Sequence, residues 1–257
     1  MIHSSETLAV VTWANSQIAS SYINYFTQQK YDILATFQNN PIAPTKSIVP
    51  VKCNLQDAWD TEVAMRKDFD ALGENINAYK RILFLHLVGW FAYEWINIDQ
   101  KVLQDTFVSN VISFRNMYNA ILSRCSEVPE VTLFNIWSLS DVRVGTTPWH
   151  SYSIVKNILR EQFKKEVGLH PARMNALFVN AGTIDMDKER QLRPYADQEY
   201  RLSREELFEQ TIHDLETVKW YKEIEIYKAH PLHEEKYAHE KLEDTHARWL
   251  KEMGKKS

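Results

Sequence analysis

The chain has 257 residues, of which 44% are hydrophobic and 12% aromatic, and its formal net charge at pH 7 is −4. A chain of this length and composition can bury a large core as one α/β domain. Acidic and basic residues are interspersed along it, so the sequence has no basic footprint for nucleic acid, and we expect a small-molecule partner and no nucleic acid.

The two cysteines, Cys53 and Cys125, have no disulfide-framework or metal-site spacing, so we expect them to be reduced and buried, as in a cytoplasmic protein. The opening MIHSSETLAVV has no basic region followed by a long apolar core. The longest apolar runs, such as ILFLHLVGWF, have the size of strands. We therefore expect no signal peptide and no membrane span.

Short apolar runs alternate with longer helical patterns along the chain. The predicted strands are residues 7–11, 31–36, 47–52, 81–88, 131–137, 172–179 and, with a weaker pattern, 223–228. The predicted helices are 17–29, 57–71, 101–124 and 149–167, with a helical pair near 187–220. This alternation predicts a parallel sheet, because each crossover between parallel strands has room for a helix.

The predicted fold class is therefore α/β, a doubly wound parallel sheet of about seven strands of the Rossmann type, with helices on both faces. No linker, low-complexity segment or internal repeat divides the chain, so residues 1–229 are predicted to form a single domain. Residues 230–257 are charged and helix-prone, with Leu242 and Trp249 seven residues apart as apolar anchors. They predict a C-terminal helical extension that packs on the domain or on a second subunit.

The first strand leads into a turn of unusual composition. An apolar run from Leu8 to Val11 is followed by a polar cluster from Thr12 to Gln17 and then by a helical pattern. A strand, a tight turn and a helix in this order form the place where many α/β proteins hold a phosphate. This turn contains no glycine, and Trp13 lies within it.

The segment WHSYSIVK, after the fifth strand, places Tyr152 and Lys156 four residues apart on one face of a helix. A lysine ammonium beside a phenol lowers the pKa of the phenol, so the tyrosine can exchange a proton with an alcohol or carbonyl. Ser138, at the end of the fifth strand, can hold the same substrate oxygen. The spacing alone also arises by chance, as in Tyr237 and Lys241.

A Tyr-x-x-x-Lys motif that opens the helix after strand five, with a serine at the end of that strand, resembles the short-chain dehydrogenase/reductase family. The fourth member of that family's active group is an asparagine in the helix after strand four. Here FVSNVISFRNMYNAIL supplies it as Asn110, 28 residues before Ser138. ARMNALFVNAG is similar to the family's strand six, with Asn175 and Ala176 at a frequent Asn-Ala. The resemblance covers roughly residues 7–230.

The resemblance implies a role for each of the four residues. Tyr152 is expected to act as general acid or base. Lys156 is expected to lower its pKa and to reach the nicotinamide ribose. Ser138 would hold the substrate oxygen, and Asn110 would kink its helix and order a proton relay. The implied function is an NAD(P)-dependent oxidoreductase that transfers hydride between the cofactor and a carbonyl or secondary alcohol.

Two further properties follow from the same resemblance. Residues 187–220 would form the variable lobe that covers a small-molecule substrate. Members of the family usually pair through the helices that carry Asn110 and Tyr152, so a homodimer or homotetramer is expected.

The cofactor motif departs from the family's pattern. The family's Thr-Gly-x-x-x-Gly-x-Gly aligns without a gap with residues 12–19, and its cofactor-binding positions here include Thr12, Trp13, Gln17 and Ile18. Thr12 and the apolar Ile18 match, but Trp13, Gln17 and Ala19 replace the three glycines. Those glycines permit the tight turn, the approach of the backbone to pyrophosphate and the packing of helix on strand.

Other cofactor positions are also altered. The aspartate that the family places near the adenine is Asn54, and its Asn-x-Ala-Gly after strand four begins with His86 and keeps only Gly89. After strand two, ATFQNN has neither the acid that binds a ribose diol nor the arginine that pairs with a 2′-phosphate. NAD and NADP both remain open as cofactors.

A second function stays open beside the oxidoreductase. The chain retains the catalytic half of the pattern and has lost much of the dinucleotide-binding half. In the family, Asn110 and Lys156 would also join a hydrogen-bond network, and the role of that network here could simply be to stabilise the fold. The alternative is a catalytically silent binding, regulatory or assembly protein that has lost dinucleotide binding.

The C-terminal extension carries four histidines among glutamates: His230, His233, His239 and His246. His239 with Glu235 or Glu243 has a spacing that metal ligands use on a helix. Helix faces rich in His and Glu are usually solvated, so we predict no metal site.

Aromatic residues gather after the fourth strand: Trp90, Phe91, Tyr93 and Trp95. Near the carboxyl ends of the strands such a group can line an apolar substrate pocket. It can equally be part of the core or of a subunit interface.

Overall fold

The computed structural model describes residues 6–71, 79–92, 94, 97–124, 128–138, 149–228 and 242–255. They form one parallel sheet of seven strands in the order β3-β2-β1-β4-β5-β6-β7. The strands are β1 (Thr7–Val11), β2 (Asp32–Phe37), β3 (Ile48–Lys52), β4 (Arg81–His86), β5 (Glu130–Ser138), β6 (Met174–Ala181) and β7 (Tyr221–Ile226). All seven lie where the sequence predicts them, within about two residues, and the predicted fold class is confirmed.

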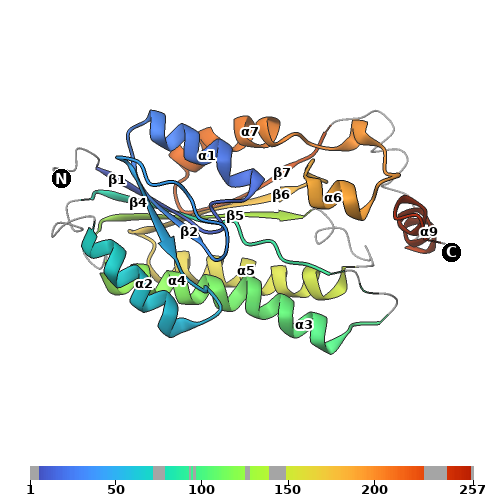
Figure 1. The fold of residues 1–257 in the computed structure, drawn as a ribbon, viewed down its shortest axis with the longest axis horizontal. Helices are drawn as coiled ribbons and strands as arrows, with labels where there is room; N and C mark the ends of the chain where they lie inside the picture. Colours follow the sequence, from blue (N-terminus) through green and yellow to red (C-terminus); the bar gives the residue numbers. More distant parts are fainter. Residues whose placement is uncertain are drawn as a thin grey trace.

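Helices cover both faces of the sheet (Figure 1). One face carries α1 (Gln17–Gln28) and α7 (Arg204–Thr217), and the other carries α2 (Ala58–Ala71), α4 (Ser113–Arg124) and α5 (His150–Leu169). Each face buries its own apolar cluster, since strands covered on both sides alternate side chains between two cores. α1 starts at Ser16, whose hydroxyl accepts from the Ala19 amide at 3.3 Å.

The predicted helix 101–124 is three segments. α3 (Gln100–Phe107) leads through a π-helical turn, Val108–Ile112, into α4. The sequence pattern did not reveal this turn, because one extra residue barely disturbs helical periodicity over so short a stretch. Asn110 lies at the centre of the turn.

The predicted helical pair is α6 (Asp187–Leu192), a short 3-10 turn (Gln198–Tyr200) and α7. The C-terminal helix, α9 (Leu242–Glu252), packs on its own chain, one of the two arrangements that the sequence left open. The rings of Trp249 and Trp149 are 5.3 Å apart, and the Tyr195 amide donates to the Glu252 carbonyl at 3.0 Å. No helix in the described part of the chain is long and apolar enough to cross a membrane.

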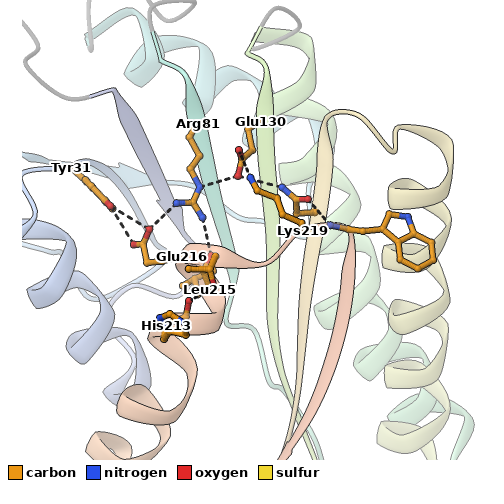
Figure 2. Close-up of polar contacts among 10 residues, drawn as sticks. Tyr31, Arg81, Glu130, His213, Leu215, Glu216 and Lys219 are labelled. Carbon is orange, nitrogen blue, oxygen red and sulfur yellow. Dashed lines mark hydrogen bonds and ion pairs between the residues drawn. The ribbon is translucent and has the colours of Figure 1, made fainter.

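Ion pairs tie the amino ends of the strands together (Figure 2). Arg81 of β4 lies 2.7 Å from Glu216 of α7 and 3.4 Å from Glu130 of β5. Lys219 pairs with Glu130 at 2.9 Å, and the Tyr31 hydroxyl donates to the Glu216 carboxylate at 3.3 Å. Arg81 thus joins β4, β5 and α7 at the amino ends of the strands, which is the end of the sheet remote from the candidate site.

Candidate active site and dinucleotide crevice

The residues predicted to be catalytic lie beyond the carboxyl ends of the central strands. Ser138 ends β5, in register with Ala181 of β6; the structure does not describe its side chain. Tyr152 and Lys156 lie in the first two turns of α5. The Glu94 carboxylate accepts from the Ser151 amide and hydroxyl, both at 2.6 Å, and so fixes the start of this helix.

Asn110 is fully buried in the π-helical turn. Its Nδ2 donates to the carbonyls of Trp90, at 3.0 Å, and Thr106, at 2.9 Å. Its own carbonyl lies 2.9 Å from Nε2 of His86. Within the described residues, Oδ1 of Asn110 is buried without a hydrogen-bond partner.

His86 connects the dinucleotide loop to this asparagine. Because a carbonyl only accepts, Nε2 of His86 carries the proton toward Asn110, which leaves Nδ1 as an acceptor 3.4 Å from the Thr12 hydroxyl. Burial, followed by the charge of Lys156, lowers the pKa of His86 to about 3, against a partial opposing effect of the Asn110 hydrogen bond. The imidazole is therefore neutral in the folded protein at ordinary pH.

Lys156 is fully buried. Its Nζ donates to the Val88 carbonyl and to Oδ1 of Asn135, both at 3.3 Å, and lies 5.4 Å from the centre of the Tyr152 ring. Nδ2 of Asn135 donates in turn to the His86 carbonyl. One network therefore brings Lys156 and Asn110 together through Asn135 and His86.

Sequence reasoning missed Asn135. It lies in the middle of VTLFNIW, an otherwise apolar strand with no counterpart among the motif residues. The signal that could have found it is the amide itself, since a buried asparagine needs hydrogen-bond partners and so indicates a polar neighbour.

Tyr152 is half-buried and faces a pocket of about 110 Å³. Five of the lining residues are aromatic: Phe91, Trp137, Trp149, Tyr152 and Trp249. Of the aromatic group after strand four, Phe91 lines the pocket and lies 5.6 Å from Tyr152, whereas Trp90 does not line it, and Tyr93 and Trp95 lie outside the described residues.

The same pocket has a polar side. Thr183, Glu189 and Arg193, which follow β6, contribute to the wall. Arg193 is buried and pairs with Glu189 at 2.5 Å and with Glu252 of α9 at 3.1 Å. Arg193 and Glu189 have the i,i+4 spacing of a local helical pair, whereas the pair with Glu252 joins segments far apart in the chain and could not be seen in the sequence pattern.

The dinucleotide loop keeps its turn without glycine. Trp13 has φ of +49°, in the left-handed region that favours glycine, and this conformation costs a tryptophan about 1–2 kcal/mol. Hydrogen bonds hold the backbone there: the Thr12 amide donates to the Leu85 carbonyl at 3.0 Å, and the Ala14 amide to the Thr36 carbonyl at 3.0 Å. The Thr12 hydroxyl also accepts from the Leu87 amide at 2.9 Å.

Trp13 occupies the crevice beyond the ends of β2 and β3. It packs against the apolar cluster on the α2–α4–α5 face and lines a cavity of only about 30 Å³ together with Asn54. Oδ1 of Asn54 accepts from the Gln56 amide at 3.2 Å and so stabilises its own turn. A cavity of that volume holds one or two water molecules.

Gln17 bridges the crevice at the start of α1. Its Nε2 donates to Oδ2 of Asp187 at 2.7 Å, and its Oε1 accepts from the Asp187 amide at 3.1 Å. This reciprocal pair, the Gln17–Asp187 clasp, ties α1 to α6. Ile18 packs against the α1–α7 core, and a Cβ at Gly89 would meet nothing within 4 Å, so no close approach requires that glycine.

These residues do not fit a dinucleotide in the manner of the glycine-rich loop. Ligand pockets usually measure about 300–1,000 Å³, whereas the cavity beside Trp13 measures about 30 Å³ and the pocket beside Tyr152 about 110 Å³. Trp13 and Gln17 stand at positions where the family's loop has glycine, and their side chains take up space that glycine leaves free beside the backbone amides.

No group of three or more His, Cys, Asp or Glu side chains in the described part of the chain is arranged to hold a metal ion. His230, His233 and His239 lie outside the described residues, and so does the side chain of His246. Cys53 is buried, and burial raises its thiol pKa to about 12, whereas Cys125 lies outside the described residues.

The chain matches neither a protein-family model nor a curated protein sequence. Solved structures are similar to it. An alcohol dehydrogenase from the archaeon Thermococcus sibiricus, complexed with 5-hydroxy-NADP, has 13% sequence identity and a TM-score of 0.70, over 87% of this chain and 97% of the other.

Two further structures agree. An NADPH-dependent 3-quinuclidinone reductase from Rhodotorula rubra has 10% identity and a TM-score of 0.69, over 88% of this chain and 91% of its own. A short-chain dehydrogenase/reductase from Brucella melitensis has 14% identity and a TM-score of 0.67, over 87% and 96%. The chain therefore has the fold of short-chain dehydrogenase/reductase structures.

Proposed function

We propose that the chain is a short-chain dehydrogenase/reductase family member that binds a small molecule beside Tyr152 and has lost dinucleotide binding. The observation that carries this proposal is the filled crevice, in which Trp13 leaves about 30 Å³ and Gln17 clasps Asp187. Both side chains come from positions where the family's loop has glycine.

The physical reason concerns the start of α1. A pyrophosphate binds there because backbone amides point at it and no side chain intervenes. In this chain the clasp places a carboxylate, that of Asp187, at the same helix end. An incoming phosphate would have to displace the clasp and overcome the repulsion of that carboxylate, and the indole of Trp13 would also have to move.

Titration of the full-length chain with NADH and with NADPH tests the proposal, by calorimetry and by nucleotide fluorescence. We expect no saturable binding of either nucleotide up to millimolar concentration. An authentic dehydrogenase of the same fold serves as the positive control. Saturable binding of either nucleotide would refute the loss of dinucleotide binding.

The second candidate is an NAD(P)-dependent oxidoreductase acting on a carbonyl or secondary alcohol, with NAD and NADP both open. The arrangement of Tyr152 in the pocket wall, with the Lys156 ammonium 5.4 Å from its ring, favours it. In this candidate Tyr152 exchanges the proton, Lys156 lowers its pKa, Ser138 holds the substrate oxygen and Asn110 orders the relay. Nucleotide binding together with turnover that Tyr152→Phe abolishes would establish it.

Self-association is part of the proposal in either case. The exposed face of α5 carries Ile154 and Ile158, which are 39% and 38% exposed and one helical turn apart. We expect a homodimer or homotetramer, measured by light scattering. Ile158→Glu is expected to shift the association equilibrium toward the monomer. A wild-type chain that is monomeric by light scattering would contradict the expectation.

A further inference from the structure

We infer that the pocket beside Tyr152 takes an uncharged ring-sized compound with one hydrogen-bond-accepting oxygen, and that α9 closes it against larger and anionic ligands. This inference deepens the proposed function, since it rests on a ligand site beside Tyr152. It does not depend on whether a dinucleotide also binds.

Size sets the first limit. The volume of about 110 Å³ is somewhat below that of the apolar cavity of roughly 150 Å³ that is known to take benzene. Five of the lining side chains are aromatic, so flat or cyclic apolar surface is what the wall can contact. A ligand of about six or seven non-hydrogen atoms matches this space.

Charge sets the second limit. Arg193, the cation in the wall, pairs with both Glu189 and Glu252, and the other oxygen of Glu252 accepts from Arg248 at 3.0 Å. Two cations thus meet two carboxylates, and their charges cancel. Lys188 is exposed and lies over the Phe91 ring at 4.4 Å, but it is not among the lining residues. Among the described residues that line the pocket, Arg193 is the one cation, and its two carboxylate partners would compete with a carboxylate ligand.

The hydroxyl of Thr183 determines the polar group of the ligand. It accepts from Nη2 of Arg193 at 3.0 Å, which leaves its own proton to donate. That proton has no acceptor among the residues that the structure describes, and Thr183 lines the pocket. A ligand oxygen that accepts a hydrogen bond, such as a carbonyl, would satisfy it, and the Tyr152 hydroxyl is a second polar group in the same wall.

The wall contributed by α9 is held in place from several sides. The Trp249 ring lies 5.3 Å from Trp149 and 4.7 Å from the Arg193 guanidinium. α9 is followed by Gly254, whose φ of +69° lies in the left-handed region that favours glycine. The Tyr195 amide donates to the Glu252 carbonyl at 3.0 Å and so holds the end of α9, and Trp249 on this helix limits the size of the pocket.

The first experiment measures binding of cyclohexanone, cyclobutanecarboxylate and methylcyclohexane, which have equal numbers of non-hydrogen atoms, to the full-length chain without nucleotide, by ligand-observed NMR. We expect saturable binding of cyclohexanone and affinity at least about tenfold weaker for the other two compounds. Trp249→Ala and Thr183→Val are each expected to weaken cyclohexanone binding at least about fivefold. Trp59→Ala, at a tryptophan that is 79% exposed on α2, is the matched control and should leave binding unchanged.

The second experiment frees the cation. Glu252→Gln removes one of the two carboxylates that hold Arg193, so the affinity for cyclobutanecarboxylate should rise at least about fivefold. The inference is overturned if the carboxylate binds the wild type as well as cyclohexanone does. It is also overturned if no compound binds, or if neither Trp249→Ala nor Thr183→Val changes the affinity. Nucleotide binding in the separate titration would refute only the loss of dinucleotide binding, because these measurements contain no nucleotide.

Discussion

The amino ends of the strands and the Lys156 network beyond their carboxyl ends use polar residues differently. At the amino ends, Arg81 meets the carboxylates of Glu130 and Glu216, so each charge has an opposite charge as its partner (Figure 2). At the carboxyl ends, the buried ammonium of Lys156 donates to a backbone carbonyl and to the amide of Asn135. The charge of this ammonium acts on its neighbours, since after burial it is the next cause of the lowered pKa of His86.

The difference separates a structural role from a functional one within one sheet. Matched ion pairs hold strands in place and leave little charge for a ligand. A buried charge that shifts the pKa of a neighbour, as Lys156 does at His86, is typical of functional sites. Four predictions test this contrast, in order of decreasing effect.

Arg81→Met should have the largest effect on stability. It leaves two carboxylates at the amino edge without their common partner, and we expect the free energy of unfolding to fall by about 2–4 kcal/mol. Urea denaturation measures the loss. Lys80→Met breaks the exposed pair with Glu6 and should change the free energy by less than about 0.5 kcal/mol. Equal losses in the two variants would show that the amino edge is not held by its ion pairs.

His86 should make the stability of the chain depend on pH. Its pKa is about 3 in the folded protein and near 6.5 when unfolded, so below the higher value the unfolded state binds the extra proton. The free energy of unfolding should therefore fall by about 2–3 kcal/mol between about pH 6 and about pH 4 from this residue alone. His86→Asn should remove that part of the slope, measured by denaturation at several pH values.

A control separates titration from simple destabilisation of the core. Ile82→Val, in the same strand, should lower the free energy of unfolding at every pH and keep the wild-type slope. An unchanged slope in His86→Asn would mean that the imidazole is not held neutral in the folded state.

Restoring glycine should reopen the crevice at the carboxyl edge. The triple variant Trp13→Gly, Gln17→Gly, Ala19→Gly removes the indole and breaks the Gln17–Asp187 clasp. It also removes the backbone strain of a tryptophan in the left-handed region. We expect it to bind NADPH saturably below millimolar concentration, where the wild type shows no saturable binding, measured by calorimetry. Ser20→Gly, on an exposed position of α1, controls for glycine in the helix. No gain in affinity would show that Trp13 and Gln17 are not what closes the crevice.

The Gln17–Asp187 clasp should give the smallest effect. Both residues are exposed or half-buried, so a double-mutant cycle of Gln17→Ala and Asp187→Ala should yield a coupling energy of about 0.5–1 kcal/mol. Denaturation of the two single variants and the double variant measures it. Additive losses would show that the clasp does not join α1 to α6 in solution.

The sequence predicted the fold well because its strands are short apolar runs between helical patterns. A continuous apolar run such as RILFLHLV is typical of a strand in a parallel sheet, because both faces of such a strand are buried. The π-helical turn around Asn110 was the main omission. It depends on one extra residue, which local periodicity does not register.

The candidate site was only partly predictable. The motif placed Asn110, Tyr152 and Lys156 correctly on their elements, but it did not indicate that His86 and Asn135 link them. The alignment showed that glycines were lost but not where the replacing side chains go. Those contacts depend on the tertiary fold, which brings residues 17 and 187 together.

The π-helical turn makes the length of this segment matter more than the identity of most of its residues. One additional residue rotates everything after it by about 100° around the helix axis, so α3 packs against α5 while α4 packs against α2. Deleting one residue from 108–112 would restore a regular helix and turn the apolar side of α4 away from the sheet. Tolerance to substitution in this segment is therefore no guide to its tolerance of insertions and deletions.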